Sequence, residues 1–225
     1  MTKMNFGDLN DLEEKEIELL IKELSIIQSK LKGHIIPEKY PCQISNLMAS
    51  IVLSLRGHLD LTRDNMIKIS SYCLVSKDWI KELIPMLQGK NCLEIMSGSG
   101  MLARGFQEEG IHVIATDSKE WGIDDCWCEV EALNANDAVS KYGKNMDYII
   151  CSWPPYNSSV ATETLLSMRN LNPNCRMIYI GEMGGCCGTE DFSDICVTET
   201  NNYITNANQK FKHWGGIHDR IFLLR

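Results

Sequence analysis

One stretch of the chain, residues 91–118, constrains the fold more than any other. Its apolar runs, small residues and helical periodicity predict four consecutive elements: a buried strand at 92–96, a tight turn at 97–100, a helix at 101–109 and a second strand at 111–116. Gly110 is placed to end the helix. Strand, glycine turn, helix and strand in this order predict the first half of a nucleotide-binding βαβ fold, and therefore an α/β protein.

The residues around the glycine turn indicate the ligand. Gly98 and Gly100 lack side chains where an adenosine-bearing ligand would pass over the strand end, and Asp117 can accept both hydrogen bonds of a ribose diol. A carboxylate at Glu94 would repel a pyrophosphate, which favours a cationic ligand without phosphate. S-adenosylmethionine has a sulfonium, an ammonium and a ribose, and fits these residues. The alternative is a glycine turn in an ordinary α/β protein.

Two segments, LEIMSGSG at 93–100 and ATD at 115–117, resemble motifs I and II of the class I S-adenosylmethionine-dependent methyltransferases. The resemblance covers residues 76–225. It implies a Rossmann-like methyltransferase fold, with a mostly parallel seven-stranded sheet whose last strand is antiparallel. We assign that last strand to residues 218–225, and residues 1–75 then form a helical extension or cap.

The resemblance also implies roles for individual residues. Glu94 would order the glycine loop or contact the methionine end of the cofactor, and Asp117 would bind the ribose. Met96 stands where the family has the first of three glycines, which narrows the space at the strand end. The predicted cofactor-binding residues are Glu94, Met96, Ser97, Gly98, Gly100, Asp117, Ser118 and Asn134, the last through its side-chain oxygen to the adenine amino group.

A predicted strand at 147–151 leads into SWPPYN at 152–157, beside the expected reactive end of the cofactor. This segment resembles motif IV of amino-methyltransferases, whose first residue accepts a hydrogen bond from the target amine. Trp153 cannot accept one, because an indole N–H is only a donor, so Ser152 or main-chain carbonyls would substitute. The alternative is a proline-stiffened strand end with core aromatics.

A second loop, GEMGGCCG at 181–188, follows a predicted strand at 176–180 at the same sheet edge. Glu182 can bind a substrate hydroxyl or amine there, or be a solvated loop residue. With SWPPY and the C-terminal strand, this loop resembles a largely uncharacterised subgroup of methyltransferase-like proteins. The predicted catalytic residues are Ser152, Trp153, Pro154, Tyr156 and Glu182.

The N-terminal region reads as helices at 11–31, 45–55 and 61–71, with Thr62 or Asp64 as N-cap of the third, and another helix at 76–87 opens the cofactor domain. The first helix carries one apolar stripe, which we expect to pack against residues 45–87: Ile17, Leu20, Leu24, Ile27 and Leu31.

Composition narrows the classes of function. The formal net charge of −8 disfavours a general nucleic-acid binder, which usually has a basic excess. Ten cysteines without a signal-like N-terminus predict reduced thiols that fill the core of a cytoplasmic protein. Their spacing gives no zinc motif, so no metal is expected. No apolar run reaches the ~18 residues of a membrane span.

The leading interpretation is therefore an S-adenosylmethionine-dependent methyltransferase acting on a nitrogen of a small molecule or protein side chain. Two alternatives stay open: a non-catalytic binding module that acts through its helical extension, and a nucleic-acid amino-methyltransferase, ranked lower for the acidic residues at 124–131. An NAD-dependent dehydrogenase is disfavoured, because the turn lacks the G-x-G-x-x-G spacing. The oligomeric state is open.

Overall fold

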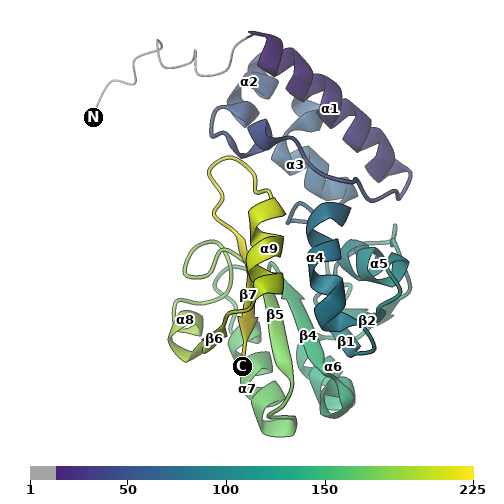
Figure 1. Ribbon diagram of the computed structural model, residues 1–225, viewed down its shortest axis with the longest axis vertical. Coiled ribbons are helices and arrows are strands. Elements are labelled where there is room, and N and C mark those ends of the chain that lie inside the picture. Colours follow the sequence, from purple (N-terminus) through teal and green to yellow (C-terminus); the bar gives the residue numbers. More distant parts are fainter. Residues whose placement is uncertain (1–13) are drawn as a thin grey trace.

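The computed structural model describes residues 14–225, and within them seven strands form one sheet (Figure 1). The strands are β1 (Asn91–Ile95), β2 (His112–Asp117), β3 (Val130–Ala132), β4 (Tyr148–Ser152), β5 (Arg176–Gly181), β6 (Thr198–Glu199) and β7 (Arg220–Leu224). Their order is β3-β2-β1-β4-β5-β7-β6. Strands β1 to β5 run parallel, whereas β7 runs antiparallel to both β5 and β6. This is the arrangement of the Rossmann-like methyltransferase fold, so the predicted fold class is confirmed.

Helices cover both faces of this sheet because strand side chains alternate in direction. Cys92 and Ile150 belong to a buried cluster with α4, α5 and α9, whereas Leu93 and Ile149 belong to a second cluster with α6 and α7. The helices flanking the sheet are α4 (Lys77–Leu87), α5 (Met101–Glu108), α6 (Ala135–Tyr142), α7 (Val160–Leu171), α8 (Phe192–Ile195) and α9 (Asn202–Lys210). Of these, α8 and α9 were not predicted, nor was β6.

The N-terminal extension lies at one end of the molecule, beyond α4 and α9 (Figure 1). It contains α1 (Glu14–Lys32), α2 (Ala49–Leu55) and α3 (Arg63–Met66), with 3₁₀ turns η2 (Cys42–Ser45), η3 (Leu59–Leu61) and η4 (Ile67–Ile69). The predicted start of the first helix at residue 11 lies outside the described residues. The other two predicted helices, at 45–55 and 61–71, are shorter and broken.

Side chains that bond to the backbone account for the later start of the helix predicted at 61–71. Thr62 occupies the N-cap position of α3 but caps no amide. Its hydroxyl donates to the carbonyl of Leu59, and so does the side-chain amide of Asn65. Such local bonds compete with helix formation, so the prediction of one continuous helix was wrong.

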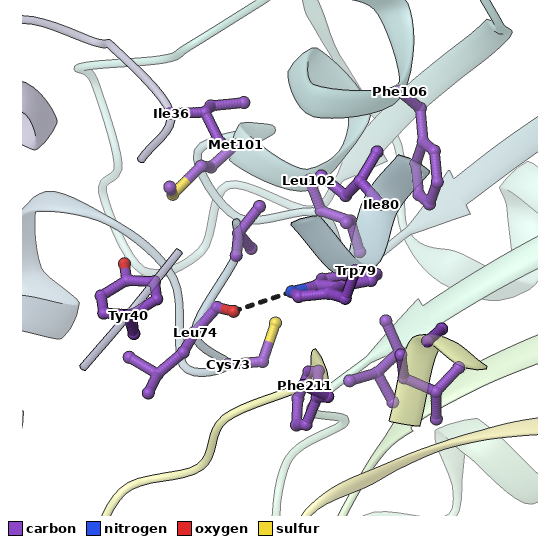
Figure 2. Close-up of a cluster of buried hydrophobic side chains, with 14 of the residues drawn as sticks. Ile36, Tyr40, Cys73, Leu74, Trp79, Ile80, Met101, Leu102, Phe106 and Phe211 are labelled. Carbon is purple, nitrogen blue, oxygen red and sulfur yellow. Dashed lines mark hydrogen bonds between the residues drawn. The ribbon is translucent and has the colours of Figure 1, made fainter. Parts of the chain in front are cut away.

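The apolar stripe of α1 is buried, as predicted, because its residues pack against α2, η2 and η3. All of its residues except Ile17 belong to a buried cluster that continues from the extension into α4 and α5. Figure 2 shows the junction: the indole Nε1 of Trp79 on α4 donates to the carbonyl of Leu74 at 3.0 Å, and Ile36 and Tyr40 of the extension lie in the same cluster as Phe106. The extension therefore shares its core with the sheet domain.

Leu24 and Leu19 make a matched test of this packing, because they lie on opposite faces of α1. Leu24 is 0% exposed and Leu19 is 47% exposed. We expect Leu24→Ala to lower the free energy of unfolding by about 2–4 kcal/mol through the cavity it leaves. Leu19→Ala should change it by less than about 0.5 kcal/mol. Guanidinium denaturation of both variants measures the difference; equal effects would mean that this stripe does not carry the docking of α1.

The cysteines follow the composition-based prediction where they are buried. All ten are free thiols, and five of them lie in the core: Cys73, Cys92, Cys151, Cys175 and Cys187. Burial raises the pKa of each of these five thiols, which keeps them protonated and unreactive. Among residues 14–225, no group of three or more metal-binding side chains is assembled. None of the described helices has both the length and the apolar character that a membrane crossing requires.

Candidate cofactor and acceptor site

The predicted site residues meet at one edge of the sheet, because β1, β2, β4 and β5 all end there. The glycine loop at 96–100 follows β1, and Asp117 ends β2. The loops at 152–157 and 181–188 follow β4 and β5. Strand β7 is antiparallel, so its first residues reach the same edge.

The two glycines of the loop have different roles. Gly98 (φ +56°) is open on its outer side: an added Cβ would meet only Ile123, at 3.6 Å. Gly100 (φ +77°) is not, since a Cβ there would lie 2.7 Å from the sulfur of Cys128. A side chain at position 98 would thus meet little obstruction, whereas Gly100 makes room for the segment before β3. The cofactor-binding role of Gly98 stays a prediction. Met96 also has positive φ, +53°, a backbone strain that often marks functional sites.

Asp117 anchors the loops on both of its sides. Its Oδ2 accepts from the amide of Gly98 at 2.9 Å, and its Oδ1 accepts from the amide of Lys119 at 2.7 Å. The side chain is 7% exposed. Each carboxylate oxygen has a second acceptor position, so the geometry leaves capacity for a diol. Ser118, the next residue, is exposed.

Glu94 is buried inside β1, not displayed at its end. Its Oε2 accepts from the amide of Ala103 in the first turn of α5 at 2.8 Å, and the residue is 2% exposed. Burial raises the pKa of this carboxyl to about 8, against the effect of the Ala103 hydrogen bond, and the charge of Asp117 raises it further. Glu94 is therefore mainly protonated at neutral pH, and a neutral carboxyl does not repel a pyrophosphate. Its observed role is to order the start of α5.

Two further predicted cofactor residues have contrasting environments. Asn134 is exposed and caps α6, since its Oδ1 accepts from the amide of Asp137 at 2.9 Å. Its predicted contact with adenine stays a prediction. Ser97 has a buried hydroxyl with no hydrogen-bond partner among the described residues. A bound ligand with a polar group above the loop would satisfy that hydroxyl.

The segment after β4 is held in a strained conformation. Trp153 has φ +51°, its amide donates to the carbonyl of Ile180, and its indole Nε1 donates to Oδ2 of Asp219 at 2.9 Å. Pro154 is buried, whereas Tyr156 is 74% exposed. The alternative of core aromatics was therefore wrong for Tyr156. The hydroxyl of Ser152 lies 3.4 Å from the sulfur of Cys73.

Glu182 braces the second loop. Its Oε2 accepts from the amide of Cys186 at 3.2 Å, and its Oε1 accepts from the amide of His218 at 3.0 Å. Burial opposes ionisation of Glu182, but hydrogen bonds from Cys186 and His218 outweigh it and lower the pKa. The two loops also join directly, because the amide of Asn157 donates to the carbonyl of Gly188 at 2.8 Å.

Several residues at this edge were missed by the sequence analysis. Asp219, just before β7, is 3% exposed, and its Oδ1 has no hydrogen-bond partner among the described residues. Arg63 and Tyr72 come from the extension: the Arg63 guanidinium carbon lies 5.2 Å from the Trp153 ring centroid, and Tyr72 stacks on Trp153 at 5.8 Å. Only Asp219 had a usable signal, its place at the start of a predicted antiparallel strand.

The extension also touches the loops that follow β1 and β2. The carbonyl of Ser70 accepts from the hydroxyl of Ser99 at 3.2 Å. His34 stacks on Trp127 at 4.7 Å, and its Nε2 lies 3.2 Å from Oδ1 of Asp125. The N-terminal region therefore borders both halves of the candidate site.

Comparisons with known proteins were made against family models, curated proteins and solved structures. The first two found no match. Among solved structures, TrmN from Thermus thermophilus is 16% identical with a TM-score of 0.45, over 80% of this chain and 52% of that one. TehB from Haemophilus influenzae is 12% identical with a TM-score of 0.45, over 72% and 66%. This chain thus spans about half the length of TrmN.

A third similar structure is the Pyrococcus abyssi tRNA (uracil-54, C5)-methyltransferase in complex with S-adenosyl-L-homocysteine. It is 13% identical with a TM-score of 0.44, over 65% of this chain and 37% of that one. The strand order of this protein itself establishes the fold. At such low identities and TM-scores, the similar structures show no activity for this chain.

Proposed function

We propose that this protein transfers a methyl group from S-adenosylmethionine to a nitrogen atom of a small molecule or a protein side chain. The observation that carries the proposal is the pair formed by Gly98 and Asp117 at the tips of β1 and β2. Gly98 is open to a ligand, and Asp117 is fixed beside it by two backbone amides. This is the geometry that a ribose diol and an adenosine need.

The residues present fit the cofactor. Asp117 would accept from the ribose hydroxyls, and the unpartnered hydroxyl of Ser97 would donate to or accept from the bound molecule. Met96 and Ser118 adjoin Ser97 and Asp117 in the chain and would border the bound cofactor. Asn134 would face the adenine. The cofactor supplies a methyl group on a sulfonium, which is already activated toward nucleophiles. The protein then contributes mainly by positioning.

On the acceptor side, residues 152–157 and 181–188 supply the wall of the site. Pro154 is buried and stiffens the turn, and exposed Tyr156 offers a flat apolar face to a planar acceptor. The choice of nitrogen rests on the resemblance of SWPPY to motif IV of amino-methyltransferases. An amine that loses its proton to solvent needs no protein base.

Two contacts favour the second candidate, a non-catalytic module that binds through its extension, because they occupy polar groups that an acceptor would otherwise contact. The Trp153 indole N–H is already engaged by Asp219, and the two acceptor-side loops are hydrogen-bonded to each other. If the protein is a methyltransferase, we assign acceptor selection to the extension, residues 1–75, because its Arg63 and Tyr72 contact Trp153. On the reduced cysteines we place the protein in the cytoplasm.

Binding measurements separate these readings. We expect calorimetry to give micromolar dissociation constants for S-adenosylmethionine and S-adenosylhomocysteine, about −7 to −8 kcal/mol. Tighter binding of NAD would overturn the assignment. Incubation with [methyl-³H]S-adenosylmethionine and amines, carboxamides, peptides, tRNA or DNA then identifies the acceptor. Cofactor binding without transfer to any of them would favour the binding module, and transfer to nucleic acid would reverse the ranking of acceptors.

A further inference from the structure

Arg63 is a cation of the extension held against the acceptor side of the site. Its guanidinium carbon lies 5.2 Å from the ring centroid of Trp153 and 5.9 Å from that of Tyr72. Its side chain is 24% exposed. Stacking on two aromatic rings fixes the plane of a guanidinium and leaves its edge donors free to bind.

These donors have no hydrogen-bond partner within residues 14–225. The Nε atom is buried and unpartnered, and the guanidinium makes no hydrogen bond to a described side chain or carbonyl. Its ion-pair partner is Asp64, which lies 4.0 Å away and is itself 86% exposed. A half-buried guanidinium whose Nε has no hydrogen-bond partner in this part of the chain and whose paired acid is 4.0 Å away carries a desolvation cost, which an anionic ligand would remove.

The position of Arg63 points to the acceptor, not to the cofactor. Its stacking partner Trp153 follows β4, whereas the adenosine-binding residues Gly98 and Asp117 follow β1 and β2. Burial raises the pKa of Asp219 to about 6, and the hydrogen bond from Trp153 and the charges of His213 and Arg63 oppose that rise. Arg63 is thus also within electrostatic range of the residue that precedes β7.

We propose that Arg63 binds a carboxylate of the methyl acceptor, so that the acceptor is a nitrogen compound that also carries a carboxylic acid. This proposal rests on the proposed methyltransferase function. A planar guanidinium pairs with a carboxylate through two parallel hydrogen bonds. Asp64 lies 4.0 Å from Arg63, and Asp219 already accepts from the Trp153 indole, so there is no excess of cations among the described residues here, which disfavours a polyanion such as a phosphate chain.

The test compares matched acceptor probes that differ only in the acid. Suitable pairs are 4-aminobenzoate with 4-aminobenzamide and glycine with glycinamide. Calorimetry measures their binding to the protein loaded with S-adenosylhomocysteine, and tritium transfer measures methylation. For the wild type, we expect at least one acid to bind ten-fold or more tightly than its amide.

Variants assign that preference to Arg63. Arg63→Gln should weaken binding of the acid at least ten-fold, leave the amide unchanged and change the affinity for S-adenosylmethionine less than two-fold. Arg63→Lys keeps the charge but cannot form two parallel hydrogen bonds, so its affinity for the acid should be intermediate. This variant replaces Arg63→Gln in the test if Arg63→Gln does not fold. Arg56→Gln is the matched control, because this arginine of the extension is already ion-paired with Glu14.

Three results would overturn the proposal. In the first, the wild type does not distinguish acids from amides. In the second, Arg63→Gln binds the acid as the wild type does. In the third, Arg63→Gln loses affinity for S-adenosylmethionine itself, which would assign Arg63 to the carboxylate of the cofactor. Failure of the wild type to bind S-adenosylmethionine is a separate outcome, which removes the proposed function on which this inference rests.

Discussion

Asp117→Ala is expected to weaken the binding of S-adenosylmethionine by 100-fold or more. The substitution removes the acceptor of the ribose diol, and it also leaves the amides of Gly98 and Lys119 without their partner. Hydrogen bonds to a charged group contribute about 1.5–3 kcal/mol each, so losing two or more of them exceeds the ~2.7 kcal/mol that corresponds to 100-fold. Calorimetry with S-adenosylhomocysteine measures the change.

Asp147→Ala is the matched control. Asp147 also accepts from a backbone amide, that of Asn91 at 2.9 Å, and pairs with Lys90. It precedes β4, however, and so lies at the opposite edge of the sheet. We expect this variant to lose stability and to keep its affinity. Unchanged affinity in Asp117→Ala would exclude Asp117 from the site, and equal losses in both variants would indicate a general effect of destabilisation.

The fold could be predicted from sequence where buried strands give uninterrupted apolar runs, as in β4 and β5. It could not be predicted where packing is sparse. Helix α9 buries only Ile204 and Ala207 among polar residues, so its periodicity is weak. Strand β6 has two residues, exists through pairing with β7, and has no sequence signal of its own.

The site shows the same division. The proximity of Gly98 and Asp117 was predictable because one strand–turn–helix–strand unit contains both. The pattern could not distinguish Gly98 from Gly100, however, since only the packing of Cys128 shows that Gly100 serves the fold. Asp219 meets Trp153 across 66 residues of sequence, and Arg63 comes from a separate structural unit. Contacts that form only on folding leave no trace in local spacing.

Glu94→Gln should make the protein more stable at alkaline pH, because the wild type must bury an ionised carboxylate there. Burial raises the pKa of Glu94 from an ordinary value of 4.5 to about 8 in the folded state. The folded state therefore binds more protons than the unfolded state between these values. The contribution of Glu94 to stability is fully present below pH 4.5 and is lost as the pH rises through 8.

The expected size of this effect follows from the shift. At 1.36 kcal/mol for each pKa unit, Glu94 costs the wild type on the order of 3–5 kcal/mol above pH 8. Glutamine keeps the acceptor for the amide of Ala103 and has no charge to bury. Urea denaturation at pH 5 should give similar free energies of unfolding for both proteins, and at pH 8.5 the variant should be more stable. The pKa of Asp219 is also raised in the folded state, but this residue contributes equally to the pH dependence of stability in both proteins.

Glu182→Gln provides the control of opposite sign. Amide hydrogen bonds lower the pKa of Glu182 despite its partial burial, so its stabilising contribution is present above pH 4.5 and is lost in acid. This variant should be less stable than the wild type at neutral pH. As the pH falls, its free energy of unfolding should approach that of the wild type. If Glu94→Gln instead lost stability at pH 8.5, the carboxylate would have to be ionised and partnered in the folded protein. Glu94 would then carry a negative charge beside the glycine loop, and this charge would favour a cationic ligand over a pyrophosphate.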